Sequence, residues 1–91
     1  MNKEKIRKLI PDFARKIAPI YKMLEWTWWS KELHDYDIPS ASEIAETLNM
    51  LLDNLGENQS VSGGGLCVSH DKAENMLSME FTVLECVHFD E

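Results

Sequence analysis

The stretch that decides the fold is residues 77–83, which read LSMEFTV. Apolar residues stand at its odd positions and polar residues at its even positions, a pattern typical of a strand with one buried face. Val87 and Phe89 continue the apolar positions further along the chain, and Glu85 interrupts them. We therefore predict one long strand running from Leu77 to Phe89.

A shorter strand is expected before it, because Leu66 and Val68 are also two residues apart. A turn over residues 70–75, centred near Lys72 and Ala73, would join the two strands. The predicted register pairs Val68 with Leu77, Leu66 with Met79 and Gly64 with Phe81. A pair of strands is rarely stable alone, and the second strand would be longer than the first can cover. We therefore expect a homodimer or larger assembly to complete the sheet.

Two helices are predicted before the strands. Residues 3–25 carry apolar residues at spacings of three and four, which favours a helix with one buried stripe. Pro11 and Pro19 lie within this pattern, so we expect a short first segment and then a main helix from near Ile10. Residues 25–40 are expected to hold the end of this helix and a loop.

The second helix has the clearest start signal. Ser40 and Glu43 fit a capping box, in which each side chain binds the backbone N–H of the other residue. Gly56 can supply a left-handed stop. The predicted buried face consists of Ile44, Leu48, Leu51, Leu52 and Leu55. The sequence thus predicts a single α+β domain over residues 1–91, with two helices followed by a long antiparallel β-hairpin (ααββ).

Composition points to an ordinary globular chain of 91 residues, 44% hydrophobic and 27% charged. No apolar run approaches the roughly 20 residues that span a bilayer, so no membrane association is expected. Cys67 would face about Ser78, with Cys86 too far along the strand for a disulfide. Free thiols suit a reducing compartment, so we expect a cytoplasmic protein.

Metal and cofactor sites are not expected. Cys67, His70, Cys86 and His88 are suitable ligand types, but the predicted register separates Cys67 from the last two, and no close Cys-x-x-Cys pair exists. No motif pairs a nucleophile with a base and an orienting group. We therefore predict no catalytic residue and a protein that is not an enzyme.

Charge is unevenly distributed along the chain, whose net charge is −7. Residues 1–31 carry eight Lys/Arg and three Asp/Glu, whereas residues 32–91 carry one Lys and thirteen Asp/Glu. The first helix could simply cover the acidic remainder, or it could offer a basic strip to an anionic ligand. The acidic part could instead compete with nucleic acid for a basic protein. Direct DNA binding is not expected at this net charge.

Candidate binding residues fall in two short runs. Trp26, Trp28 and Trp29 could anchor the core, or they could stack on a planar base, with Trp28 expected to face outward. The glycine run 63–65 could be a bulged strand entry, or its N–H groups could bind an anion. Arg15 and Lys22 could meet phosphates. The complete predicted ligand-binding set is Arg15, Lys22, Trp26, Trp28, Trp29, Ser62, Gly63, Gly64 and Gly65.

The same motifs carry a resemblance. The string LEWTW at 24–28, Ile-Pro at 38–39 with Glu-Ile at 43–44, and Ser-Gly-Gly at 62–64 before an alternating strand resembles small phage and prophage proteins of Gram-positive bacteria. This chain departs from that pattern by a third tryptophan, Trp29, and a third glycine, Gly65. The resemblance implies an accessory phage protein that antagonises host defence from the host cytoplasm.

Three functions remain open at this point. The chain could bind and sequester a nucleotide-derived signalling molecule, with the base on tryptophan and the phosphates on the glycine run. It could be an acidic inhibitor of a host nucleic-acid-binding or CRISPR-type effector. It could also be a structural or assembly protein without a ligand.

Overall fold

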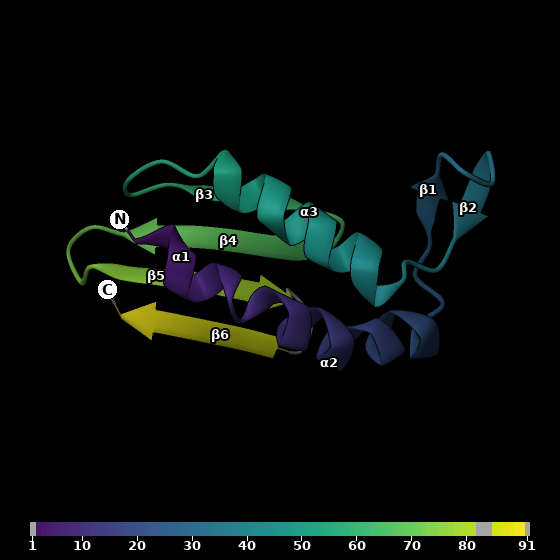
Figure 1. Cartoon of the computed structure of the whole chain (residues 1–91), viewed down its shortest axis with the longest axis horizontal. Coiled ribbons are helices and arrows are strands. Elements are labelled where there is room, and N and C mark those ends of the chain that lie inside the picture. The colour runs from purple at the N-terminus through teal and green to yellow at the C-terminus, as the bar shows by residue number, and fades with distance from the viewer. Residues whose placement is uncertain (1, 82–84, 91) are drawn as a thin grey trace.

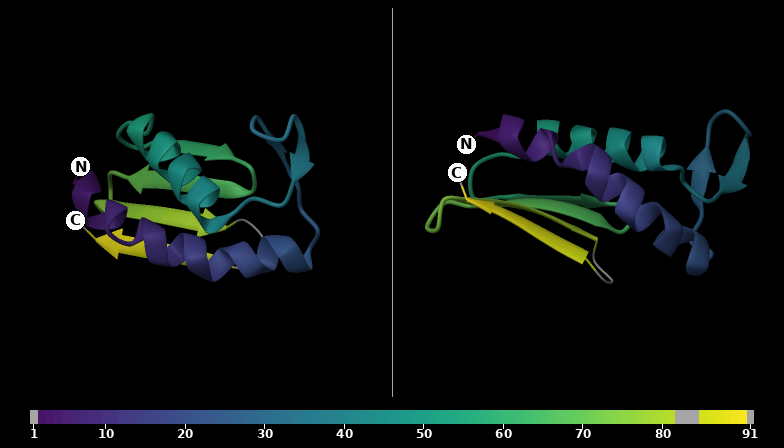
Figure 2. Two further views of the ribbon diagram at one scale, coloured as in Figure 1. Left: turned by 45° about the vertical axis from the view of Figure 1, so that its right-hand side comes forward. Right: turned by 60° about the horizontal axis from the view of Figure 1, so that its bottom comes forward.

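The computed structural model describes residues 2–81 with their side chains and the backbone of residues 85–90. It has an α+β fold, as predicted, in which helices cover one face of an antiparallel sheet (Figures 1 and 2). The helices are α1 (Lys3–Arg7), α2 (Ile10–Met23) and α3 (Ala41–Asp53). The strands are β1 (Trp28–Ser30), β2 (Asp35–Asp37), β3 (Ser60–Gly63), β4 (Leu66–Asp71), β5 (Met76–Phe81) and β6 (Glu85–Asp90).

The helical part agrees with the periodicity of the sequence. A short α1 precedes α2, and Pro11 occupies the first turn of α2, where its missing N–H would have no helical partner. Ser40 and Glu43 form the predicted capping box. The predicted stop at Gly56 was wrong, because α3 ends at Asp53 with Asn54 as a right-handed cap.

The predicted long hairpin was also wrong. Residues 77–89 do not form one strand but contribute to two antiparallel neighbours, β5 and β6, in a four-stranded sheet of order β3-β4-β5-β6. The register pairs Leu77 with Phe89 and Met79 with Val87. Odd residues therefore pair with odd residues, and the apolar alternation continues unchanged from one strand to the next. A pattern of period two cannot reveal a reversal of this kind.

The register between β4 and β5 differs from the prediction by two residues. Val68 pairs with Met79 rather than Leu77, and Leu66 pairs with Phe81 rather than Met79. The turn is centred between Ala73 and Glu74, one residue later than expected. Gly64 is not opposite Phe81, because it lies in the turn between β3 and β4.

The core lies between the helices and the inward face of the sheet. Because a two-residue slip preserves the faces of a strand, the predicted inward residues of β4 and β5 are indeed buried. The helices, the strands and Leu55 in the loop after α3 contribute apolar side chains that are at most 6% exposed. These are Ile6, Ile10, Phe13, Ala14, Ile17, Tyr21, Ile44, Leu48, Leu51, Leu52, Leu55, Leu66, Val68, Leu77, Met79 and Phe81.

Oligomerisation stays a prediction, and the length of the last strand no longer favours it. The apparent excess length of the last strand is β6, which pairs with β5 inside the same chain. The sheet therefore needs no second copy to reach four strands.

Candidate functional site

A two-stranded arm projects from the end of the molecule opposite the N and C labels (Figure 1). The arm consists of residues 28–37, in a segment for which we predicted only a helix end and a loop. Its strands β1 and β2 pair Trp28 with Asp37, Trp29 with Tyr36 and Ser30 with Asp35. Since side chains alternate along a strand, Trp28 and Trp29 must lie on opposite faces of the arm.

The inner face of the arm packs on the body through Trp28. A methyl group added at Gly64 would lie 2.5 Å from Trp28 Cζ2, and one added at Gly65 would lie 2.5 Å from Trp26 Cη2. The two indole rings therefore lie directly against the glycine run. The prediction that Trp28 faces outward was wrong.

Tyr21 joins this contact from α2. Its hydroxyl donates a hydrogen bond to the Gly64 carbonyl at 2.5 Å, and its ring centroid lies 5.4 Å from those of both Trp26 and Trp28. Burial raises the pKa of Tyr21 well above its usual range. The Trp28 indole N–H is buried and has no hydrogen-bond partner among the residues that the structure describes. These contacts hold the arm to the body.

The remaining glycine-run residues have structural surroundings as well. Gly64 and Gly65 have φ of +62° and +86°, the left-handed conformations that the turn between β3 and β4 requires. Gly63 pairs with Leu66, and Ser62 is exposed and pairs with Cys67. The structure thus brings the glycine run and two tryptophans together, as the predicted site required, but aromatic rings lie over the glycines.

The outer face of the arm is exposed and aromatic. Trp29 is 54% exposed and Tyr36 is 66% exposed. Their ring centroids are 5.5 Å apart, with the planes inclined at 75° in an edge-to-face pair. Tyr36 was absent from the predicted set, because neither an Asn-Gly nor an Asp-Gly pair marks the turn of this hairpin.

Exposed apolar residues are frequent in the stretch of sequence that contains this pair. Six large apolar residues are exposed among the side chains that the structure describes, and five of them fall within residues 23–36. We call these five the arm end: Met23, Leu24, Trp29, Leu33 and Tyr36. Exposed apolar residues scattered singly need no explanation. Trp29 and Tyr36 are both exposed and in ring contact with each other, which makes this pair the candidate interaction surface.

The arm end lies in an acidic part of the sequence. Residues 23–43 contain five carboxylates, at Glu25, Glu32, Asp35, Asp37 and Glu43, and a single Lys/Arg, Lys31. Asp35 and Asp37 are exposed, and each accepts a hydrogen bond from the backbone N–H that follows it, at 2.8 Å. Two fixed carboxylates in the strand that carries Tyr36 favour a cationic partner over an anionic one.

The predicted basic residues lie on α2, not on the arm. Arg15 forms an ion pair with Asp12, and both side chains are exposed. Lys22 is exposed in the last turn. The two are seven residues apart, about 10 Å along a helix. The predicted set therefore divides between the body, the arm and the side of α2.

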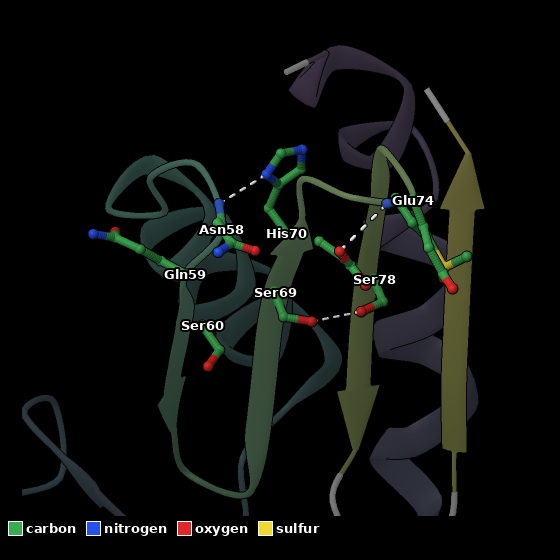
Figure 3. A pocket seen from close by; sticks show the side chains of 9 residues that line it. Asn58, Gln59, Ser60, Ser69, His70, Glu74 and Ser78 are labelled. Atoms are coloured by element: carbon green, nitrogen blue, oxygen red, sulfur yellow. Dashed lines mark hydrogen bonds between the residues drawn. The ribbon is translucent and has the colours of Figure 1, made fainter.

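A shallow polar pocket of about 450 Å³ lies elsewhere, at the sheet end near the turn from β4 to β5 (Figure 3). Its floor contains the hydroxyls of Ser69 and Ser78, which are 2.6 Å apart and hydrogen-bonded to each other. His70 Nδ1 accepts from the Asn58 backbone N–H at 3.0 Å. Ser69 and His70 lie on opposite faces of β4, so this serine and histidine do not form a nucleophile–base pair.

The two cysteines flank one residue. Glu80 pairs with Cys67 on one side and with Cys86 on the other, so the prediction that Cys67 faces Ser78 was wrong. Two strand spacings, about 9.6 Å, separate the cysteine backbones, which exceeds the span of a disulfide. Burial, and secondly the charge of Glu80, raise the pKa of the Cys67 thiol.

The described part of the chain carries few further indications of function. Within residues 2–81 and 85–90, no group of three or more His, Cys, Asp or Glu is placed to hold a metal ion. None of the helices in this described part has the length and apolar character needed to cross a membrane. No family model, curated protein or solved structure matches the chain. The resemblance to phage proteins therefore stays a prediction.

Proposed function

We propose that this chain is a non-enzymatic binding protein that recognises a basic surface of a partner protein through the arm end. The observation that carries this proposal is the exposed Trp29–Tyr36 pair within an acidic segment. Tryptophan and tyrosine are enriched among the few residues that dominate binding energy at protein interfaces. The surrounding carboxylates would favour a partner of positive charge.

Inhibition is the form of activity that this surface would serve best. A basic surface that binds nucleic acid attracts carboxylates through the same electrostatic field. A small acidic protein seated on that surface would exclude the nucleic acid without any chemical step. The proposal therefore joins the arm end to the acidic-inhibitor hypothesis, in which the target is a host nucleic-acid-binding effector and the chain an accessory phage protein.

The test is affinity capture with a purified candidate effector. We expect binding by the native chain and release as salt rises from 0.05 to about 0.5 M, because exposed charges are screened. Trp29→Ala with Tyr36→Ala should weaken binding by at least 2 kcal/mol, the size typical of interface hot spots. Met50→Ala is the matched control, since Met50 is exposed on α3 and outside the arm. Equal binding by the arm variant and the control would contradict the proposal.

Nucleotide sequestration is the second candidate, because the exposed faces of Trp29 and Tyr36 also suit a planar base. Lys31 in the arm turn is a cation available to a phosphate. Calorimetry against cyclic dinucleotides and ADP-ribose derivatives tests it. Binding that Trp29→Ala abolishes would support this candidate over the first, and no heat with any of these nucleotides would eliminate it.

A further inference from the structure

We infer that the outer face of the arm binds an arginine side chain, while the carboxylates on the other face of the arm attract that side chain without contacting it. The inference rests on the proposed function and specifies the chemistry of the partner. It follows from the strand pairing, which places Trp29 and Tyr36 on one face of a narrow ribbon and Asp35 and Asp37 on the other.

The aromatic face suits a flat cation. Trp29 and Tyr36 meet edge to face with 75° between their planes, which leaves ring faces exposed at an angle to each other. A guanidinium can lie flat on such a face, with its positive charge over the negative centre of the ring. A lysine ammonium is a compact and more strongly hydrated charge, so it gains less from the same surface.

The acidic residues have a different position. Asp35 and Asp37 flank Tyr36 in β2, so alternation directs them to the face opposite its ring. Across a ribbon of this thickness, a carboxylate lies roughly 9 Å from a cation stacked on the rings. That distance is too long for a salt bridge but close to the screening length at physiological salt.

The size of each contribution follows from these positions. A stacked guanidinium should bind about 2- to 30-fold more tightly than a neutral group of the same shape. In water, one charge at roughly 9 Å changes affinity by about twofold, so the two carboxylates together should contribute up to about fourfold. Screening at high salt should remove the contribution of the carboxylates and leave most of the contribution of guanidinium stacking.

The experiment uses a peptide of three arginines separated by glycines, with lysine and citrulline versions as matched probes. Citrulline keeps the planar shape of arginine and lacks its charge. Binding is followed by NMR from the indole N–H signals of the native chain at low and high salt. We expect the arginine peptide to bind more tightly than both others, and Trp29→Ala to abolish the difference.

A second variant tests the carboxylates. Asp35→Asn with Asp37→Asn keeps an oxygen able to accept the two backbone hydrogen bonds and removes both charges. It should weaken binding of the arginine peptide up to about fourfold at low salt and have little effect at 0.3 M salt. If the double variant still weakens binding at high salt, the carboxylates contact the arginine directly, and the inference that they act from a distance is wrong.

Equal binding of the arginine peptide and either matched probe would overturn the arginine assignment, and so would peptide binding that survives Trp29→Ala. These results are separable from failure of the proposed function. An effector whose capture requires Trp29 and Tyr36, beside a peptide that does not bind, would leave the proposed function standing and refute only the arginine inference.

Discussion

Replacing Gly64 by alanine tests the contact that holds the arm to the body. The added methyl group would lie 2.5 Å from Trp28 Cζ2 and 2.7 Å from Trp28 Cε2. These atoms belong to a ring that already packs on the core, so one of the two elements must move. The backbone adds a second penalty, since Gly64 has φ of +62° and a Cβ disfavours that conformation.

The two penalties can be added to a first approximation. The left-handed conformation costs a residue with a Cβ about 1–2 kcal/mol, and overpacking of a filled site costs about 1–3 kcal/mol. Gly64→Ala should therefore lower the free energy of unfolding by about 2–5 kcal/mol. A chain of this length has about 5–14 kcal/mol in total at typical values, so the loss would be large. At about 1–3 kcal/mol per molar urea it would lower the urea midpoint by roughly 0.7–5 M.

Gly63→Ala is the matched control, one residue away. Its added methyl would meet only Leu51 Cδ2 at 3.8 Å, an ordinary contact, and its φ is not in the left-handed region. This control should be neutral or gain up to about 1 kcal/mol from reduced freedom of the unfolded chain. Urea denaturation of both variants is the assay. A Gly64→Ala loss within 1 kcal/mol of the control would refute the reasoning.

A second background separates the two penalties. Trp28→Phe replaces the indole by a smaller ring. In that background, Gly64→Ala should lower the free energy of unfolding only by the backbone penalty of about 1–2 kcal/mol. The difference between the two backgrounds is the coupling between the methyl group and the indole. If the loss is the same in both, the indole contact has no part in it.

Three further predictions follow from buried or capping groups. Tyr21→Phe should lower the free energy of unfolding by about 1–2 kcal/mol at pH 7, measured by thermal or urea unfolding. Because the folded pKa of Tyr21 is raised, the stability of the native chain should fall as pH rises above about 10. The phenylalanine variant should not show this fall. Ser40→Ala should lower the free energy of unfolding by about 1 kcal/mol, whereas Ser40→Asp, which can still cap α3, should lower it much less. Equal losses in the two variants would argue against the cap. In a Cys86→Ser background, Cys67 should react with iodoacetamide at pH 8 more slowly than free cysteine, and Glu80→Gln should accelerate it; a fast reaction in both chains would contradict the raised pKa.

The helices could be predicted from the sequence because their signals are local. The cap at Ser40 depends on residues three apart, and the apolar stripe of α2 depends on residues three or four apart. The face pattern of the strands was predictable for the same reason. The number of strands was not predictable, since the sequence between Phe81 and Glu85 contains no Gly, Pro, Asn or Asp, the residues that usually mark a turn.

The candidate site was predicted in part. Three tryptophans in four residues indicated the importance of this segment, and Trp29 does offer its ring to solvent. Which tryptophan faces inward depends on whether the segment is a helix end or a strand. In a strand, neighbouring side chains such as those of Trp28 and Trp29 point to opposite faces, so only one of the two can face the body. Tyr36 joins the site only through pairing with Trp29, a contact that no local pattern around either residue specifies.

The two-faced arm also supplies the molecule with two optical reporters in adjacent residues. Tryptophan emission depends on the polarity around the indole, so exposed Trp29 should emit at longer wavelength than half-buried Trp26 and Trp28. The caesium ion, a cationic quencher, should quench Trp29 first, since it reaches only exposed rings and the nearby carboxylates attract it. Occupation of the outer face should then protect the quenchable fraction, while the emission of the other two follows the integrity of the fold. One fluorescence titration without any added label can thus distinguish a variant that has lost its partner from one that has lost its structure.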